Sequence, residues 1–282
     1  MKFFSFRAGG GAAHYGIVDG NKVVDLTPRL KYPDLKALIA ADGRAEAERA
    51  AKGVSADFTL QQIAFDPVIT NSAKIICIGL NYDDHINETR MAKPPYPTIF
   101  TRWGDSHVGH LQPLIKPRDS DHFDYEGELV AIIGKGGRHI TQADAMNHVA
   151  GYSCYNEGSV RDYQRHASQF TPGKNFASSG AFGPFMVTSD EMGPLAGKKI
   201  QTRLNGKTVQ SSTLDMMIFP VPRLIEYISI FTPLSPGDII VTGTPGGVGW
   251  VRTPPLWMKA GDSVEVEIEG VGVLKNPVAD ET

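Results

Sequence analysis

The chain has 282 residues, 41% of them hydrophobic, and a formal net charge of −3. This length and composition are sufficient for a large packed core, in one large domain or in a large domain with a small companion. The 28 basic and 31 acidic residues are nearly balanced without a basic stripe, and no apolar run reaches the length of a membrane span, so we expect neither a nucleic acid nor a membrane as partner.

The N-terminal segment and the cysteines indicate a reducing compartment. Lys2 and Arg7 interrupt the apolar N-terminal residues before the core of a signal peptide could form, and we therefore expect a cytosolic protein. Cys77 and Cys154 lie within apolar, strand-like segments and are expected to be buried thiols rather than a disulfide. The 30 glycines and 19 prolines, with few long patterns of helical period, favour a fold rich in strands and turns.

Residues 1–70 are predicted to form a small N-terminal domain. Its expected elements are a strand at 3–7, a hairpin of 15–18 and 22–26, and two short helices rich in Ala and Leu. Pro67 should end the helical stretch and turn the backbone to an extended conformation, so the main domain, residues 71–282, is expected to begin just after it. The N-terminal segment carries no group of residues that suggests chemistry.

A histidine and a glutamate follow the first strand of the main domain. The apolar run 74–79 predicts a buried strand, and residues 80–88 predict a helical turn after it. His85 and Glu88 are three residues apart and share a face of that turn, where the carboxylate can orient the imidazole as a general base that activates water. The same pair can be an exposed ion pair, which contributes under about 1 kcal/mol.

Two carboxylates begin a strand that is otherwise apolar on both faces. In the strand predicted at 125–134, Glu126 and Glu128 point to one face, followed by Val130 and Ile132, while the other face is also apolar. A strand of this kind is usually covered on both sides. A buried carboxylate there costs several kcal/mol unless a cation compensates it, and hard divalent ions take such ligands. The alternative is that the start of the strand is exposed and both glutamates are solvated.

A third carboxylate emerges where the next predicted strand, 149–155, ends. Glu157 follows this strand and is a candidate third metal ligand. Arg161 and Gln164 stand three residues apart on the helical turn that follows, and they can donate hydrogen bonds to the carboxylate or carbonyl of a substrate.

Two more cations lie near turns or strand ends. Arg102 ends the strand predicted at 98–102, where it can hold an anionic substrate or lie on the surface. Lys174 stands in a loop defined by Gly and Pro. It can stabilise an oxyanion or an enolate, or be an ordinary loop lysine.

The C-terminal third is predicted from turn residues and apolar periodicity. Its expected elements are a hairpin over 199–211, a core helix with Pro222, Leu224, Ile225, Ile228 and Phe231, a buried strand at 239–241, and a final alternating strand at 264–269. The three glutamates on one face of the last strand are expected to be in solvent. The glycine-dense segment 242–249 lacks the context of a phosphate-binding motif and is expected to close over a small substrate.

Six motifs in order make the sequence resemble the fumarylacetoacetate hydrolase family across about residues 74 to 278. They are Gly79-Leu80-Asn81-Tyr82 with His85 and Glu88, Glu126-Gly127-Glu128, Arg161-Asp162-Tyr163-Gln164, Gly173-Lys174, Pro236-Gly237-Asp238 and Thr242-Gly243-Thr244-Pro245. The resemblance implies a mostly β fold with some α, a mixed β-sandwich or β-roll, next to a small N-terminal α+β domain. It also implies a homodimer that holds one divalent ion beside a keto acid.

The resemblance implies three sets of site residues when it is carried over position by position. The metal ligands would hold Mg²⁺ or Mn²⁺, with Ca²⁺ able to take its place, and they are Glu126, Glu128 and Glu157. The catalytic residues would be the water-activating His85 and Glu88 with the electrophilic Lys174. The residues in contact with the small keto-acid substrate would be Tyr82, Arg102, Arg161, Gln164 and Thr244.

Three positions depart from the family pattern. Glu157 stands where Asp is common, and its longer arm still permits ligation. Arg102 stands where many relatives have lysine. The segment 176–179 replaces an Asp-rich continuation and alters the expected wall of the pocket, so it leaves the identity of the substrate open.

The leading hypothesis from the sequence is a metal-dependent hydrolase that cleaves a carbon–carbon bond of an acylpyruvate-like β-diketo acid. Water activated by His85 and Glu88 would attack the distal carbonyl, and Lys174 with the metal would stabilise the enolate that leaves. A first alternative keeps the site but decarboxylates an oxaloacetate-type acid or interconverts keto and enol forms, neither of which needs an attacking water. A remote alternative is a non-catalytic keto-acid-binding protein.

Overall fold

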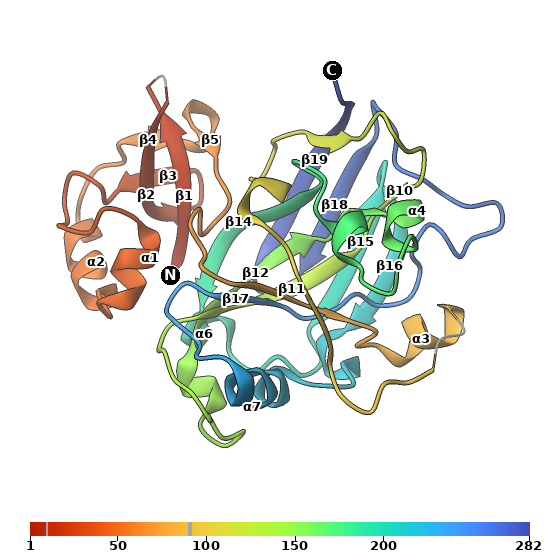
Figure 1. The fold of residues 1–282 in the computed structure, drawn as a ribbon. Coiled ribbons are helices and arrows are strands. Elements are labelled where there is room, and N and C mark those ends of the chain that lie inside the picture. Colours follow the sequence, from red (N-terminus) through yellow and green to blue (C-terminus); the bar gives the residue numbers. More distant parts are fainter. Residues whose placement is uncertain (10, 90–91) are drawn as a thin grey trace.

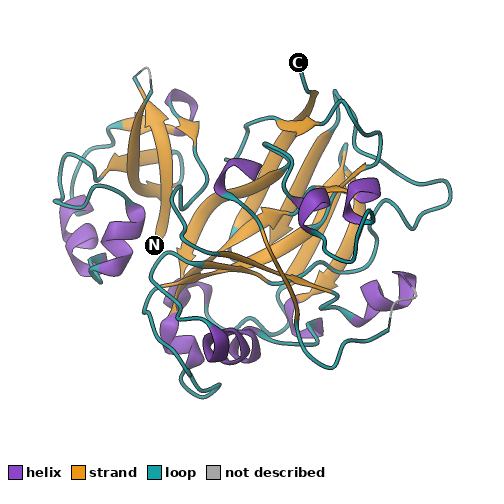
Figure 2. Ribbon diagram, viewed as in Figure 1, coloured by secondary structure: helices purple, strands orange, loops and turns teal. Residues whose placement is uncertain are grey.

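Strands carry most of the regular structure in the computed structural model, which describes residues 1–9, 11–89 and 92–282 (Figures 1 and 2). A twelve-stranded sheet has the order β4-β3-β2-β1-β14-β12-β11-β17-β6-β7, and in addition β5 pairs with β1 and β8 pairs with β14. A five-stranded sheet has the order β16-β15-β18-β19-β9, and β10 pairs with β13. The expectation of a mostly β fold with some α is confirmed.

The N-terminal elements form the separate lobe at the left of Figure 1. They are β1 (Lys2–Ala8), β2 (Ala12–Asp19), β3 (Lys22–Asp25), α1 (Leu35–Ala40), α2 (Arg44–Ala51), β4 (Phe58–Thr59), η1 (Leu60–Gln62) and β5 (Ala64–Phe65). Strand β1 pairs with β14 and so continues the large sheet into this lobe. The division of the chain at residue 70 stays a prediction.

The remaining strands complete the large sheet and build the five-stranded sheet and the β10–β13 pair. Those of the large sheet are β6 (Ile75–Gly79), β7 (Thr98–Thr101), β8 (His107–Val108), β11 (Gly127–Ile133), β12 (Val149–Asn156), β14 (Gly180–Thr188) and β17 (Ile239–Val241). Those of the smaller sheets are β9 (Leu114–Lys116), β10 (Phe123–Asp124), β13 (Ser159–Val160), β15 (Lys199–Leu204), β16 (Lys207–Thr213), β18 (Ser263–Ile268) and β19 (Gly272–Asp280).

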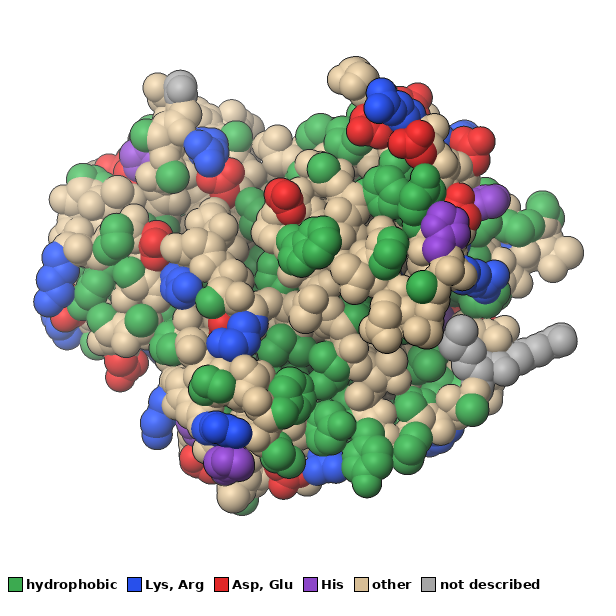
Figure 3. All heavy atoms as spheres, viewed as in Figure 1, with side chains coloured by type: hydrophobic (Ala, Val, Ile, Leu, Met, Phe, Trp, Pro, Cys, Tyr) green, Lys and Arg blue, Asp and Glu red, His purple; other side chains and the backbone are tan. Residues whose placement is uncertain are grey.

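Short helices lie at the ends and outer faces of the sheets, as Figure 2 shows. They are α3 (Asp83–Thr89), η2 (Gly104–Ser106), η3 (Ala145–His148), α4 (Arg161–Gln164), α5 (Thr171–Lys174), α6 (Ser189–Met192), η4 (Leu214–Met216) and α7 (Val221–Phe231). Within the described residues, no helix is long and apolar enough to span a membrane. The face drawn in Figure 3 carries acidic and basic side chains interspersed.

Strand β11 is the centre of the fold, and every one of its residues is buried. Leu129 and Ala131 on one face pack in the core cluster that contains Val266 of the facing sheet. Val130 and Ile132 on the other face pack in the cluster that contains N-terminal apolar residues. The prediction that this strand is covered on both sides is therefore confirmed.

Gly127 begins β11 between Glu126 and Glu128, where the facing sheet leaves no room for a side chain. A Cβ at this position would lie 2.0 Å from Thr202 Oγ1 and 3.2 Å from a methyl group of Val266. The glycine therefore lets the sheets approach each other while Glu126 and Glu128 point away from that contact.

Several local predictions are wrong. The strand at 264–269 is not the last one, since β19 follows it, and β14 was not foreseen. Phe231 is 56% exposed rather than in the core. Lys174 ends a short helix rather than lying in a loop. Glu265 and Glu267 are only partly exposed, because Arg203 donates hydrogen bonds of 2.8 and 2.6 Å to them. Both cysteines are free and buried, as predicted.

Candidate active site and metal centre

Three carboxylates meet where β11 begins and β12 ends. The two strands are antiparallel, with Gly127 opposite Asn156, so the residues just beyond these positions become neighbours. Glu157 N donates a hydrogen bond of 2.8 Å to Glu126 O. One carboxylate oxygen from each of Glu126, Glu128 and Glu157 lies within 4.8 Å of the others, and all three residues are buried. The three predicted metal ligands are thus brought together.

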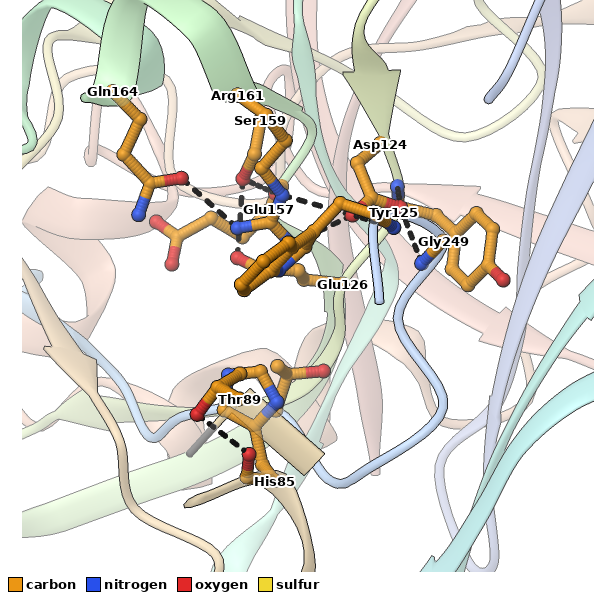
Figure 4. A network of polar contacts seen from close by, with 12 residues as sticks. His85, Thr89, Asp124, Tyr125, Glu126, Glu157, Ser159, Arg161, Gln164 and Gly249 are labelled. Atoms are coloured by element: carbon orange, nitrogen blue, oxygen red, sulfur yellow. Dashed lines mark hydrogen bonds and ion pairs between the residues drawn. The ribbon is translucent and has the colours of Figure 1, made fainter. Parts of the chain in front are cut away.

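Two buried cations contact Glu126. Arg161 Nη2 donates to Glu126 Oε1 at 2.7 Å, and Lys174 Nζ contacts Oε2 closely. Burial by itself raises the pKa of Glu126, but the charges of Arg161 and Lys174 outweigh it and hold the pKa below its ordinary value. Ser159 Oγ also donates to Oε2, at 3.1 Å (Figure 4).

The other two carboxylates have fewer donors. Glu128 accepts a hydrogen bond from Gly243 N. Burial raises its pKa well above the ordinary value, and the nearby Glu157 and Glu126 raise it further. Glu157 Oε2 lies 3.4 Å from Lys174 Nζ. Glu157 Oε1 has no hydrogen-bond partner among the residues that the structure describes. Because buried carboxylates without enough donors need a compensating cation, this set of oxygens fits a hard divalent ion.

The placement of Lys174 depends on close packing of two short helices. A Cβ at Gly173 would lie 2.4 Å from Gln164 N, so only glycine lets α5 lie this close to α4. Lys174 is 3% exposed, and its Nζ lies 5.1 Å from the centroid of the Phe100 ring. The ammonium group is therefore held in an apolar setting beside carboxylates, which strengthens its electrostatic effect.

His85 and Glu88 form the expected pair on α3. His85 Nδ1 and Glu88 Oε1 are 2.9 Å apart, and Glu88 Oε2 accepts a hydrogen bond of 2.7 Å from Gly247 N. His85 is 6% exposed, so the pair is not the exposed ion pair of the alternative interpretation. Its Nε2 has no hydrogen-bond partner in the described ranges. Figure 4 shows His85 across an open space from Glu126 and Glu157.

The glycine-dense segment 242–249 holds carboxylates with its backbone. Its amides at Gly243, Gly247 and Gly249 donate to Glu128, Glu88 and Asp124 respectively. Gly243 and Gly247 have φ values of +101° and +107°, which favour glycine, and a Cβ at Gly247 would lie 2.2 Å from Val209 O. The segment therefore connects the start of β11 with helix α3 and fixes both relative to the triad.

A narrow cavity of about 40 Å³ lies between the triad and His85. Its lining includes Glu126, Glu128, Glu157, His85 and Lys174, and of the predicted substrate contacts it includes Arg161, Gln164 and Thr244. Thr244 Oγ1 donates to Gly127 O at 2.9 Å and accepts from Gln210 Nε2 at 2.8 Å. The predicted metal ligands, the catalytic His85 and Lys174, and three of the predicted substrate residues thus surround one space, while Glu88 contacts it only through His85.

Two predicted substrate residues are placed elsewhere. Arg102 is buried behind Glu157, where its guanidinium donates to Gly158 O at 3.0 Å and to Ser179 Oγ at 2.7 Å. Tyr82 is fully buried, and burial raises the pKa of its hydroxyl above the ordinary value. Neither residue lines the cavity. The structure therefore does not bring these two residues to the cavity, and their contacts with substrate stay predictions.

Sequence reasoning missed Asp124, Gln210 and Trp250. Asp124 Oδ2 accepts from Arg161 Nε at 2.8 Å, and Asp124 Oδ1 accepts from Gly249 N at 2.8 Å. Burial raises the pKa of Asp124, while Arg161 beside it acts in the opposite direction. A signal for Asp124 was present, since it stands two residues before Glu126 in the same strand-like run. Trp250 and Gln210 carry no local signal, because only the tertiary fold brings them here.

Comparison with known proteins identifies the class to which this fold and site belong. The family model described as fumarylacetoacetate (FAA) hydrolase C-terminal matches residues 74–279. The chain belongs to the fumarylacetoacetate hydrolase family, as the resemblance of its motifs implied.

Particular relatives narrow the comparison. The rat protein named oxaloacetate tautomerase Fahd2a, mitochondrial, is 42% identical over 77% of this chain and 70% of its own length. A crystal structure of a putative HpcE protein from Mycobacterium smegmatis superimposes with a TM-score of 0.88 at 32% identity, over the whole of both chains. Maleylpyruvate hydrolase from Sphingobium sp. SYK-6, in complex with manganese (II) ion and pyruvate, superimposes with a TM-score of 0.83 at 26% identity, also over both whole chains.

These relatives correct two expectations. The hydrolase hypothesis is wrong as the leading interpretation, because the rat, bovine and human relatives are named oxaloacetate tautomerases, which corresponds to the first alternative. The physical reason is that the site for enolate stabilisation is common to both reactions, so motifs alone do not separate them. The cytosolic expectation is also wrong, since the same relatives are named as mitochondrial proteins.

Proposed function

We propose that the protein interconverts the keto and enol forms of oxaloacetate or a closely similar 2-keto diacid. The observation that carries this proposal is the single cavity that joins His85 and Lys174 to three buried carboxylates. The names of the mammalian relatives support the choice of reaction.

The carboxylates of Glu126, Glu128 and Glu157 would hold Mg²⁺ or Mn²⁺, with Ca²⁺ as a possible substitute. Two observations support this assignment: Glu157 Oε1 accepts no hydrogen bond from a described residue and has Arg102 Nη1 only at 4.0 Å, and Glu128 is weakly compensated. When bound, the ion supplies Lewis acidity to the keto oxygen and makes the adjacent carbon more acidic.

The protein's own residues handle the proton. Tautomerisation removes one proton from the carbon next to the carbonyl and places one on the carbonyl oxygen, or the reverse, so no atom is gained or lost. His85, with Nδ1 held by Glu88, offers Nε2 to accept or return the proton at carbon. Lys174 donates a hydrogen bond to the oxygen where negative charge gathers, and Arg161 and Gln164 orient the acid.

A direct kinetic measurement tests this function. Enolic oxaloacetate is mixed with the Mg²⁺-loaded protein, and the decay of enol absorbance in the ultraviolet is compared with the decay in buffer that contains the same Mg²⁺. We expect faster equilibration in proportion to protein concentration. An unchanged rate refutes the proposal, and release of pyruvate at the rate of enol loss would indicate decarboxylation instead.

We also propose that two copies of the chain associate. Large apolar side chains lie exposed on and near α7, with Ile230 50%, Phe231 56% and Tyr96 58% exposed, and the Tyr96 and Tyr227 rings stack 5.8 Å apart. Exposed apolar groups of this size support a protein contact. Light scattering should give twice the mass of one chain, and Phe231→Asp should shift the mass toward one chain.

A further inference from the structure

Arg165 stacks on Trp250, which lines the cavity. Its Cζ is 4.0 Å from the centroid of the Trp250 ring, and the Cζ of Arg161 is 6.0 Å from the same ring. Arg161 begins α4, and Arg165 follows its last residue with helical backbone angles, so the two arginines are one turn apart on the same side. Trp250 and Arg161 both line the cavity, and Arg161 contacts Glu126 inside it. Arg165 therefore adds a second guanidinium group on the outer side of Arg161.

The stacking on Trp250 holds the guanidinium group of Arg165 in one orientation. Its side chain is exposed and forms no salt bridge with any residue that the structure describes. Stacking on an indole orients a guanidinium group while leaving its donors available. Trp250 is itself held, since its backbone N donates to Asp124 Oδ2 at 3.2 Å, the oxygen that also accepts from Arg161 Nε.

The charges around the cavity show what this arginine can do. The buried acids there are Asp124, Glu126, Glu128 and Glu157, and the buried bases are Arg102, Arg161 and Lys174. Glu88 beside His85 adds a fifth acid to the four, so a divalent ion just balances the excess of two negative charges over the three bases and leaves no positive charge for a dicarboxylate. A substrate with a second carboxylate therefore requires a further cation, because an unmatched charge near a low-dielectric site is costly.

Resting on the tautomerase function above, we propose that Arg165 binds the second carboxylate of a dicarboxylic 2-keto acid and makes the site selective for diacids over monoacids. Both guanidinium groups face the same indole ring, with their Cζ atoms 6.0 and 4.0 Å from its centroid. A diacid whose first carboxylate lies near Arg161 therefore has its second carboxylate within reach of Arg165.

Equilibrium binding tests the selectivity without turnover. The Mg²⁺-loaded protein is titrated with oxaloacetate and with pyruvate, which differ by the second carboxylate, and rapid mixing with tryptophan fluorescence detection precedes any reaction. For Arg165→Gln we expect affinity for oxaloacetate to fall about fivefold, the size of a favourable exposed ion pair, with affinity for pyruvate unchanged. Arg165→Lys should lose less, since it keeps the charge.

Arg138→Gln is the matched control. Arg138 is also an exposed arginine, but it follows the opposite end of β11 from the triad, so its loss should change neither affinity. Equal weakening of both acids by Arg165→Gln, or no weakening, overturns the inference. Loss of the diacid preference in a protein without tautomerase activity supports the inference while refuting the proposed function. Tautomerase activity in the parent protein, with an unchanged diacid preference in Arg165→Gln, supports the proposed function and refutes the inference about Arg165.

Discussion

Substituting Gly127 by alanine tests how the gap between the two sheets supports the metal centre. The added Cβ would lie 2.0 Å from Thr202 Oγ1, which no real Cβ tolerates, and close to Val266, so the sheets must move apart or β11 must shift. Glu126 and Glu128 flank this position. We therefore expect Gly127→Ala both to destabilise the fold and to weaken binding of Mn²⁺.

The magnitude follows from the surroundings. Overpacking a buried site lowers the free energy of unfolding by about 1–3 kcal/mol. Replacing glycine by alanine also reduces the entropy of the unfolded chain, which offsets about 0.4–1 kcal/mol of that loss. Thr202→Ala alone should be nearly neutral. It loses a buried methyl group worth about 0.8 kcal/mol, but it also removes a buried hydroxyl that has no hydrogen-bond partner among the described residues.

The double variant decides whether the hydroxyl is the obstacle. In Gly127→Ala/Thr202→Ala the nearest clash is gone, so the free energy of unfolding in urea should recover by about 1–2 kcal/mol relative to Gly127→Ala. Calorimetric affinity for Mn²⁺ should recover with it. Strictly additive effects of the two substitutions would show that Thr202 does not limit the gap, and our account of Gly127 would be wrong.

Three further variants test individual roles. Glu128→Gln should lower the calorimetric affinity for Mn²⁺ at least about tenfold. The unfolding temperature of the metal-free protein should not fall, because the substitution removes repulsion from Glu126 and Glu157. Unchanged affinity would remove Glu128 from the ligand set. His85→Asn should retain Mn²⁺ affinity while kcat for tautomerisation falls about 10²- to 10⁴-fold, and a normal kcat would exclude His85 as the base. Arg102→Met should lower the free energy of unfolding by about 3 kcal/mol, because it leaves buried acceptors without a donor and Glu157 without its nearby positive charge. A raised KM at unchanged stability would instead support the substrate contact predicted from the sequence.

The local sequence pattern was sufficient to predict those elements in which apolar residues recur with a regular strand or helix period. The run that became β11 is apolar on both faces, and burial on both faces is what the structure shows. The Asn205-Gly206 turn predicted the hairpin of β15 and β16, and the spacing of apolar residues predicted α7. These signals are local because backbone geometry sets the strand and helix periods.

The grouping of Glu126, Glu128 and Glu157 was predicted through motif order rather than through geometry. Two carboxylates in a buried strand require a cation, and that much follows from the cost of burying charge. The third carboxylate joins them only because β11 and β12 pair in antiparallel register, and no local property of Glu157 specifies its partner strand.

The roles of single polar side chains depended on tertiary contacts. Arg102 and Arg161 are both arginines beside strands, yet one is enclosed behind Glu157 and the other lines the cavity. Phe231 continues the apolar spacing of α7 but lies on its outer face. Periodicity states which residues share a face, whereas burial depends on what packs against that face. Spacing along the chain therefore predicted strands such as β11 and the acidic pair at its start, but not β14 or β19, while the register between strands and the packing of loops decided which charges meet.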